Sequence, residues 1–124
     1  LEIPSIKLKR GILDIDNKYN KAKYNIELIK EKDDIIILAS HNGNNYNSYF
    51  GNLKNISLGD TINYYYDGKI YKYIYTDSYD IKKDGYADIY RKKGNKCIVL
   101  VTCKDGRNDG QTVFIGYLDE ILEY

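Results

Sequence analysis

The sequence predicts a mostly β fold, a closed eight-stranded barrel with short helical turns. β-branched and aromatic residues dominate the chain, which has 15 tyrosines and one proline, and these residue types favour strands. Short apolar or alternating runs are separated by Gly-, Asn- and Asp-rich turns. Such even spacing of short strands is typical of closed β architectures.

The first third of the chain predicts two short strands and one longer strand. Ile3–Leu8 alternates, and Pro4 limits it to the edge of a sheet. Gly11–Leu13 is expected to add a second short strand. Apolar residues spaced through Asp14–Glu31 favour one or two short helical turns. Asp34–Ser40 is almost wholly apolar, which indicates a buried strand.

The middle third contains a strong hairpin signal. Thr61–Tyr66 and Lys69–Tyr75 are rich in β-forming residues and flank Asp67-Gly68. Asp-Gly between such runs predicts a type I′ turn, whose two central residues need positive φ. Before it, Tyr49–Leu53 predicts a helical or 3₁₀ turn, and Ser57–Asp60 predicts a further turn.

The last third predicts two strands separated by loops. Lys96–Cys103 is a buried strand, and Gln111–Tyr117 is the final strand. Thr76–Gly94 is expected to be mainly loop, with a short strand or turn near Ala87–Tyr90. Lys104–Gly110 is expected to be a loop, and Leu118–Tyr124 a tail. No repeat or linker divides the chain, so residues 1–124 are expected to form one domain.

Composition excludes several classes of protein. The 124 residues carry a net charge of only +1, whereas dedicated nucleic-acid binders usually have a strong basic excess. No apolar run approaches the roughly 18 residues that span a bilayer. The chain lacks methionine, and we expect a membrane segment to precede it.

Cys97 and Cys103 are expected to remain free thiols. Six residues apart on one strand, their Cα atoms would be separated by roughly 20 Å, beyond the reach of a disulfide. The two cysteines and the single histidine, at this spacing, do not make a tetrahedral zinc site. The aspartates of the 77–88 segment are more consistent with a solvated loop than with a calcium site, so no metal or cofactor is expected.

Cys103 and His41 have matching positions in the sequence. Each one closes a buried apolar strand and precedes a polar loop. If the two strands end at one edge, thiol and imidazole meet there, as a cysteine nucleophile and its acid–base partner require. Cys97 fits a buried apolar role instead.

The same chemistry needs a donor for the oxyanion that forms when the thiolate attacks a carbonyl. Arg107 lies four residues after Cys103, in the loop over the predicted site. Its guanidinium is permanently charged and offers several donors. A solvated loop charge is the competing interpretation.

The tyrosines allow a different hypothesis. Tyr64–Tyr66 and the alternating Tyr71, Tyr73 and Tyr75 resemble a platform on which single-stranded nucleic acid stacks. They equally fit a sheet face or a packed core, and the near-neutral charge disfavours nucleic acid.

Several segments resemble the sortases, cysteine transpeptidases of the Gram-positive cell surface. Val99–Cys103 resembles the T-L-x-T-C signature, with Val99 at the first Thr. Ile37–Asn42 resembles the family's strand ending in Gly/Ser-His-Asn. Phe50–Leu53, Leu58–Ile62 and the opening Leu1–Ile6 extend the likeness over nearly the whole chain.

The resemblance implies a Cys103, His41 and arginine site on an eight-stranded barrel, with Thr102 near the substrate. The family arginine usually opens the last strand, where this chain has Gln111. Either Arg107 reaches in from the loop or the Gln111 amide is the oxyanion donor.

The implied reaction cleaves a C-terminal sorting signal and transfers the acyl group to a peptidoglycan or pilin amine. The implied location is the extracellular face of the membrane, with no nucleic acid as partner. The departure at Gln111 leaves a catalytically impaired peptide-binding module as the alternative.

Overall fold

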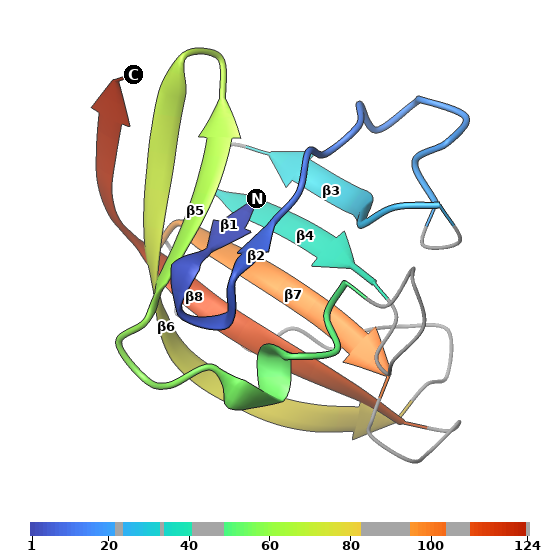
Figure 1. The fold of residues 1–124 in the computed structure, drawn as a ribbon, viewed down its shortest axis with the longest axis vertical. Coiled ribbons are helices and arrows are strands. Elements are labelled where there is room, and N and C mark those ends of the chain that lie inside the picture. The colour runs from blue at the N-terminus through green and yellow to red at the C-terminus, as the bar shows by residue number, and fades with distance from the viewer. Residues whose placement is uncertain (22–23, 33, 41–48, 83–94, 104–109, 124) are drawn as a thin grey trace.

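In the computed structural model the described residues form one eight-stranded sheet and two short 3₁₀ helices (Figure 1). The structure describes residues 1–21, 24–32, 34–40, 49–82, 95–103 and 110–123. The strands are β1 (Glu2–Ile3), β2 (Leu8–Lys9), β3 (Glu27–Lys32), β4 (Ile35–Ala39), β5 (Thr61–Tyr66), β6 (Lys69–Lys82), β7 (Cys97–Cys103) and β8 (Gly110–Glu123). The 3₁₀ helices are η1 (Pro4–Ile6) and η2 (Leu53–Asn55).

The sheet is an open half-barrel, so the expected closed barrel is wrong. The strand order is β2-β1-β5-β6-β8-β7-β4-β3, and the described residues show no pairing between the outermost strands β2 and β3. β2 has two residues, too few for a closing ladder. On β3, Leu28 donates its N–H to Asn20 Oδ1 at 2.7 Å, while Asn20 Nδ2 donates to the Leu28 carbonyl at 2.9 Å. This side chain occupies backbone groups that a closing strand would need.

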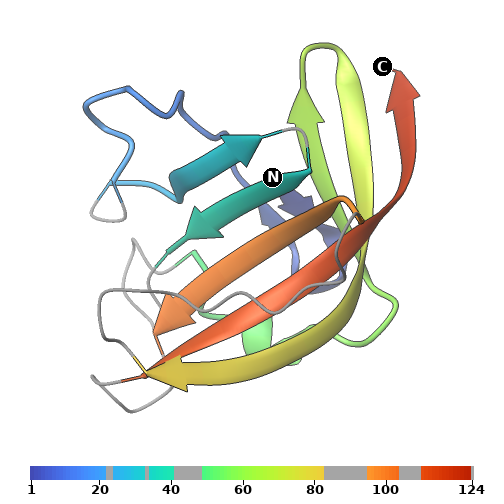
Figure 2. The same cartoon turned by 180° about the vertical axis from the view of Figure 1, so that it is seen from behind.

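The Asp-Gly hairpin is confirmed. Asp67 and Gly68 have φ values of 52° and 74°, as a type I′ turn requires. β5 and β6 pair in continuous register from Tyr66↔Lys69 to Thr61↔Ile74. The hairpin projects beyond the rest of the sheet, beside the end of β8 (Figures 1 and 2).

The predictions for the first third are partly wrong. Pro4 opens η1 rather than sitting in an edge strand, because its fixed φ suits the first position of a helical turn. Lys7 follows in the left-handed region, with φ 56°, and turns the chain so that β2 pairs with β1. The second short strand is therefore Leu8–Lys9 and not Gly11–Leu13.

One strand was not predicted, and two others are longer than predicted. Glu27–Lys32 is strand β3 and not a helical turn. β6 continues to Lys82, and β8 continues through the expected tail to Glu123. Register shifts at Lys72/Tyr73 and Tyr75/Asp77 mark bulges that let β6 and β8 remain paired as they curve. The short strand expected near residues 87–90 lies outside the described residues.

β7 lies within the sheet and is buried on both faces. Ile98 and Leu100 join one core cluster, together with residues such as Leu38 and Phe114. Cys97, Val99 and Val101 join a second cluster on the opposite face, as the alternation of side chains along a strand requires. Burial on both faces explains why this strand is an unbroken apolar run. Among the described residues, no helix is long and apolar enough to cross a bilayer.

Candidate active site

The two buried strands predicted to carry the site are parallel neighbours. β4 and β7 pair from Ile35↔Cys97 to Ala39↔Val101. The ladder extends one residue further, because the Ser40 N–H donates to the Val101 carbonyl at 3.2 Å. Their carboxyl ends therefore lie at the same edge of the sheet, and both arrows point that way in Figure 1.

Cys103 is the last residue of β7, and its Cα partner on β8 is Gln111. Gln111 is half-buried and pairs on its other side with Ile81 of β6. The backbone thus aligns the predicted nucleophile with one of the two predicted oxyanion donors. His41 and Arg107 lie outside the described residues, so their predicted roles remain predictions.

Two buried hydroxyls lie on the residues that precede His41 and Cys103. Ser40 and Thr102 are each 5% exposed. Neither Ser40 Oγ nor Thr102 Oγ1 has a hydrogen-bond partner within the described ranges. Buried hydroxyls usually have a hydrogen-bond partner, so partners for these two are expected outside the described ranges or on a bound ligand.

Polar residues continue from Ser40 and Thr102 across the neighbouring strands of the sheet. Thr102 is the Cα partner of Thr112 on β8, and Thr112 is the partner of Asp80 on β6. Thr112 Oγ1 donates to Asp80 Oδ1 at 2.8 Å. Ser40, Thr112 and Asp80 were missed as site neighbours. The change from apolar to polar residues directly before His41 is the signal that would have indicated Ser40.

Cys97 takes the buried role expected of it. It forms no disulfide among the described residues and has 0% exposure, six residues before Cys103 on β7. Burial raises the pKa of the nearby Tyr73 hydroxyl to about 12, and charge on Cys97 adds a smaller effect. This thiol therefore belongs to a dry interior, unlike a reactive cysteine.

The tyrosine platform is not supported by the burial of its members. Tyr73 and Tyr75 are 4% and 6% exposed and belong to the core cluster of one sheet face. Rings inside a core are not available for bases to stack on. Among the described residues, no group of three His, Cys, Asp or Glu side chains could hold a metal ion.

Comparison with known proteins matches the chain to one family. The family model named Sortase domain matches residues 1–118. The solved structure of Listeria monocytogenes sortase A superposes with a TM-score of 0.80 at 20% identity, covering 98% of this chain and 86% of that one. A Clostridium perfringens Sortase D5 transpeptidase has a TM-score of 0.77 at 17% identity, covering 96% of this chain and 76% of that one.

A more distant similarity is found with Sortase C-3 from Streptococcus pneumoniae, which has a TM-score of 0.65 at 16% identity. There the match covers 72% of this chain but only 43% of that one. A search of curated proteins found no match. The family match over residues 1–118, on a sheet with the same architecture as solved sortases, shows that the chain belongs to the sortase family of cysteine transpeptidases.

Proposed function

We propose that this chain is an active sortase-type transpeptidase with Cys103 as nucleophile and His41 as its acid–base partner. The observation that carries the proposal is the parallel β4–β7 ladder, which ends at Ser40 and Val101. His41 follows Ser40 directly, and Cys103 lies two residues after Val101. Adjacent parallel strands bring their carboxyl ends together, which supports a thiol–imidazole pair at this edge.

The reaction proceeds through a thioester. The Cys103 thiolate attacks the carbonyl carbon of the scissile peptide bond, and the tetrahedral intermediate collapses when His41 protonates the departing amine. A second amine, from peptidoglycan or a pilin subunit, attacks the thioester and gives up its proton to His41. A new amide bond forms and the Cys103 thiolate is restored.

The oxyanion needs a donor, and the candidates are Gln111 and Arg107. The register of Gln111 opposite Cys103 favours Gln111 among the described residues. A neutral amide stabilises an oxyanion less than a charged guanidinium does. We therefore propose Gln111 as the donor, in a site that stabilises the intermediate less strongly than an arginine would.

Thr102 is proposed to bind the substrate. Its buried Oγ1, which has no hydrogen-bond partner in the part of the chain that is described, would recover the cost of burial by bonding to the peptide main chain. The substrate is proposed to be a C-terminal sorting signal, since the family acts at the surface of Gram-positive cells. An extracellular location and an upstream membrane segment are part of the same proposal.

A peptidase assay tests the proposal. A quenched sorting-signal peptide is incubated with an amine such as triglycine, and cleavage and the ligated product are followed. Cys103→Ala is expected to reduce kcat/KM by about 10³-fold or more, because the covalent step is lost. Cys97→Ser is the matched control and should retain activity, since this thiol lies at the other end of β7. Cleavage that survives Cys103→Ala would refute the nucleophile.

A second candidate function is suggested by Gln111. If its amide cannot support the oxyanion, the chain binds a sorting signal without cleaving it. Peptide binding with no turnover in the wild-type protein, together with cleavage gained in Gln111→Arg, would establish this alternative. For an active enzyme, Gln111→Ala should lower kcat roughly 10²-fold, as loss of an oxyanion donor does.

A further inference from the structure

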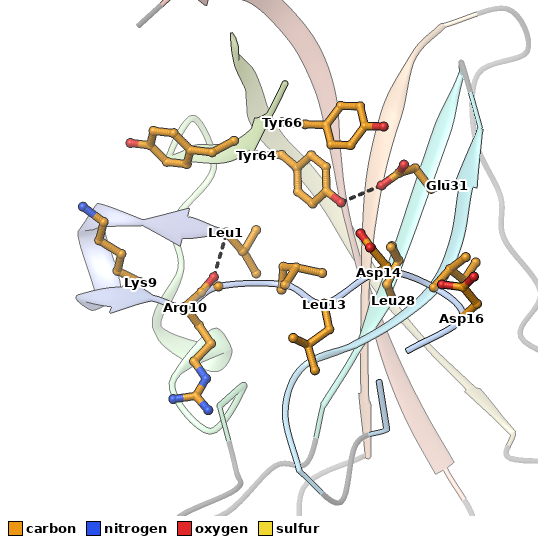
Figure 3. Close-up of a pocket in the computed structure, with 14 residues that line it drawn as sticks. Leu1, Lys9, Arg10, Leu13, Asp14, Asp16, Leu28, Glu31, Tyr64 and Tyr66 are labelled. Atoms are coloured by element: carbon orange, nitrogen blue, oxygen red, sulfur yellow. Dashed lines mark hydrogen bonds between the residues drawn. The ribbon is translucent and has the colours of Figure 1, made fainter. Parts of the chain in front are cut away.

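A cleft is lined by the N-terminal segment, β3 and the end of β5. Most of its lining lies away from the Cys103 edge, although Leu28 pairs with Leu38, two residues before Ser40. Its volume is about 530 Å³, and Leu28, Glu31 and Tyr64–Tyr66 line it (Figure 3). A smaller cavity of about 260 Å³ shares Glu31, Tyr64 and Tyr66 with it and reaches Ile36 and Lys96. Those two residues lie at the start of β4 and just before β7. Since β7 spans roughly 20 Å, the smaller cavity is well separated from the Cys103 edge.

The interior of the cleft is apolar. Leu1, Leu28 and Tyr64 are buried there, and Ile12 and Leu13 are half-buried. Tyr65 and Tyr66 are more exposed, at 36% and 51%. A ligand with an aliphatic chain could therefore pack against the apolar base of the cleft, with its far end near the exposed tyrosine rings.

Carboxylates supply the polar part of the cleft. Asp14, Asp16 and Glu31 line it, and none of the three forms an ion pair among the described residues. The Tyr64 hydroxyl donates to Glu31 Oε2 at 2.8 Å, which holds that carboxylate at the cleft (Figure 3). The carboxylates are too dispersed to count among the possible metal-binding groups of the described chain.

The two basic side chains that line the cleft, Lys9 and Arg10, are directed elsewhere. Arg10 Nε donates to Asn25 Oδ1 at 2.7 Å, and its guanidinium lies 4.5 Å from the centre of the Tyr49 ring. In Figure 3, the Lys9 and Arg10 side chains extend away from Tyr64 and Glu31. The cleft therefore combines an apolar base, exposed aromatic rings and carboxylates that form no ion pair within the described part of the chain.

We propose that this cleft binds the lysine side chain of a peptide. The aliphatic stem would pack against Leu28 and Leu13, and the ammonium would meet Glu31 and Asp14 with the face of Tyr66 nearby. Carboxylate–ammonium hydrogen bonds and cation–π contacts both favour this charge over an anion. This binding site is independent of the proposed transpeptidation.

A binding experiment on the whole chain tests the proposal. A blocked leucine-lysine-leucine peptide is titrated into ¹⁵N-labelled protein, and amide shifts are followed by NMR. The control peptide carries Nε-acetyl-lysine, which keeps the stem but removes the charge. We expect the lysine peptide to bind about tenfold more tightly, with shifts around Glu31 and Tyr64–Tyr66. Its affinity should fall as salt is added, because the paired charges are near the surface.

Variants separate the cleft from the rest of the surface. The double variant Asp14→Asn, Glu31→Gln should weaken lysine-peptide binding about tenfold, while Gln keeps an acceptor for the Tyr64 hydroxyl. Glu120→Gln, on β8 outside the cleft, is the matched control and should bind like wild type. Equal affinity for the two peptides, an unaffected double variant, or shifts confined to the ends of β4 and β7 would each overturn the proposal. Because the readout is binding, its failure leaves the peptidase test unaffected.

Discussion

At the scale of single residues, two buried asparagines organise the segment between β2 and β3. Asn25 accepts from Arg10 and donates to the Gly11 carbonyl at 2.9 Å. Asn20 donates to the Ile15 carbonyl at 3.1 Å. Its side chain also donates to the Leu28 carbonyl and accepts from the Leu28 N–H. Buried amides satisfied in this way replace secondary structure as the partner of the backbone. The described parts of this segment, residues 10–21 and 24–26, are consequently held in place without forming a helix.

Asn20→Ala is expected to destabilise the protein by about 1–3 kcal/mol, because the buried Leu28 N–H and carbonyl lose their partner. Urea unfolding followed by circular dichroism measures the change. Asn55→Ala, at an exposed position of η2, should leave the midpoint nearly unchanged. An equal effect of the two substitutions would show that the Asn20 hydrogen bonds contribute nothing specific.

Residue patterns indicated the Cys103 strand and the strand before His41, because each is apolar up to its last residues. They did not indicate the pairing of Cys103 with Gln111, which depends on the register of two strands. Nor did they indicate the Glu31–Tyr64 contact, which joins residues 33 positions apart. Long-range register depends on tertiary packing and is not contained in local periodicity.

At the scale of elements, the β5–β6 turn was the most predictable feature, because positive φ at two consecutive positions demands particular residue types. Gly68 has φ 74°, and a Cβ placed on it would meet no atom within 4 Å. Any loss of stability caused by a side chain at position 68 therefore comes from the backbone conformation and not from a steric clash.

Gly68→Ala is expected to lower the free energy of unfolding by about 1 kcal/mol, the penalty for a side chain in the left-handed region. Gly11→Ala is the matched control, since its Cβ also meets nothing within 4 Å and its φ is not positive. Thermal unfolding of both variants gives the comparison. A stabilised Gly68→Ala protein would contradict the strain assigned to the turn.

Strand β3 and the later halves of β6 and β8 were missed for one physical reason. The register shift between Leu28 and Lys30, and the shifts along β6, interrupt the two-residue alternation by which a strand is predicted. The bulges that curve the sheet also make its strands hard to recognise from sequence alternation. Pro4 was misassigned because proline suits both an edge strand and the first turn of a 3₁₀ helix.

At the scale of the whole molecule, the open sheet encloses tyrosines in its core. Burial raises the pKa of Tyr64 and Tyr73, the latter from 10.0 to about 12. A tyrosine whose pKa is raised by folding stabilises the fold fully below its unfolded pKa. That contribution is lost as the pH rises from there through the folded pKa.

The free energy of unfolding should accordingly fall between pH 10 and pH 12, by about 2 kcal/mol for Tyr73. Tyr73→Phe should make this decline shallower, and denaturant melts at several alkaline pH values measure it. Tyr19→Phe, at a site that is 50% exposed, should leave the slope unchanged. An identical slope in wild type and Tyr73→Phe would rule out this origin.

The place of β8 in the sheet has a consequence for how the chain is made. β8 joins β6 on one side and β7 on the other, although it is the last of these eight strands in chain order. Until it emerges, the β2-β1-β5-β6 ribbon and the β7-β4-β3 ribbon have no shared ladder to connect them. Completion of this sheet must therefore wait until β8 has been made, and a nascent chain stalled before Gly110 should remain sensitive to protease.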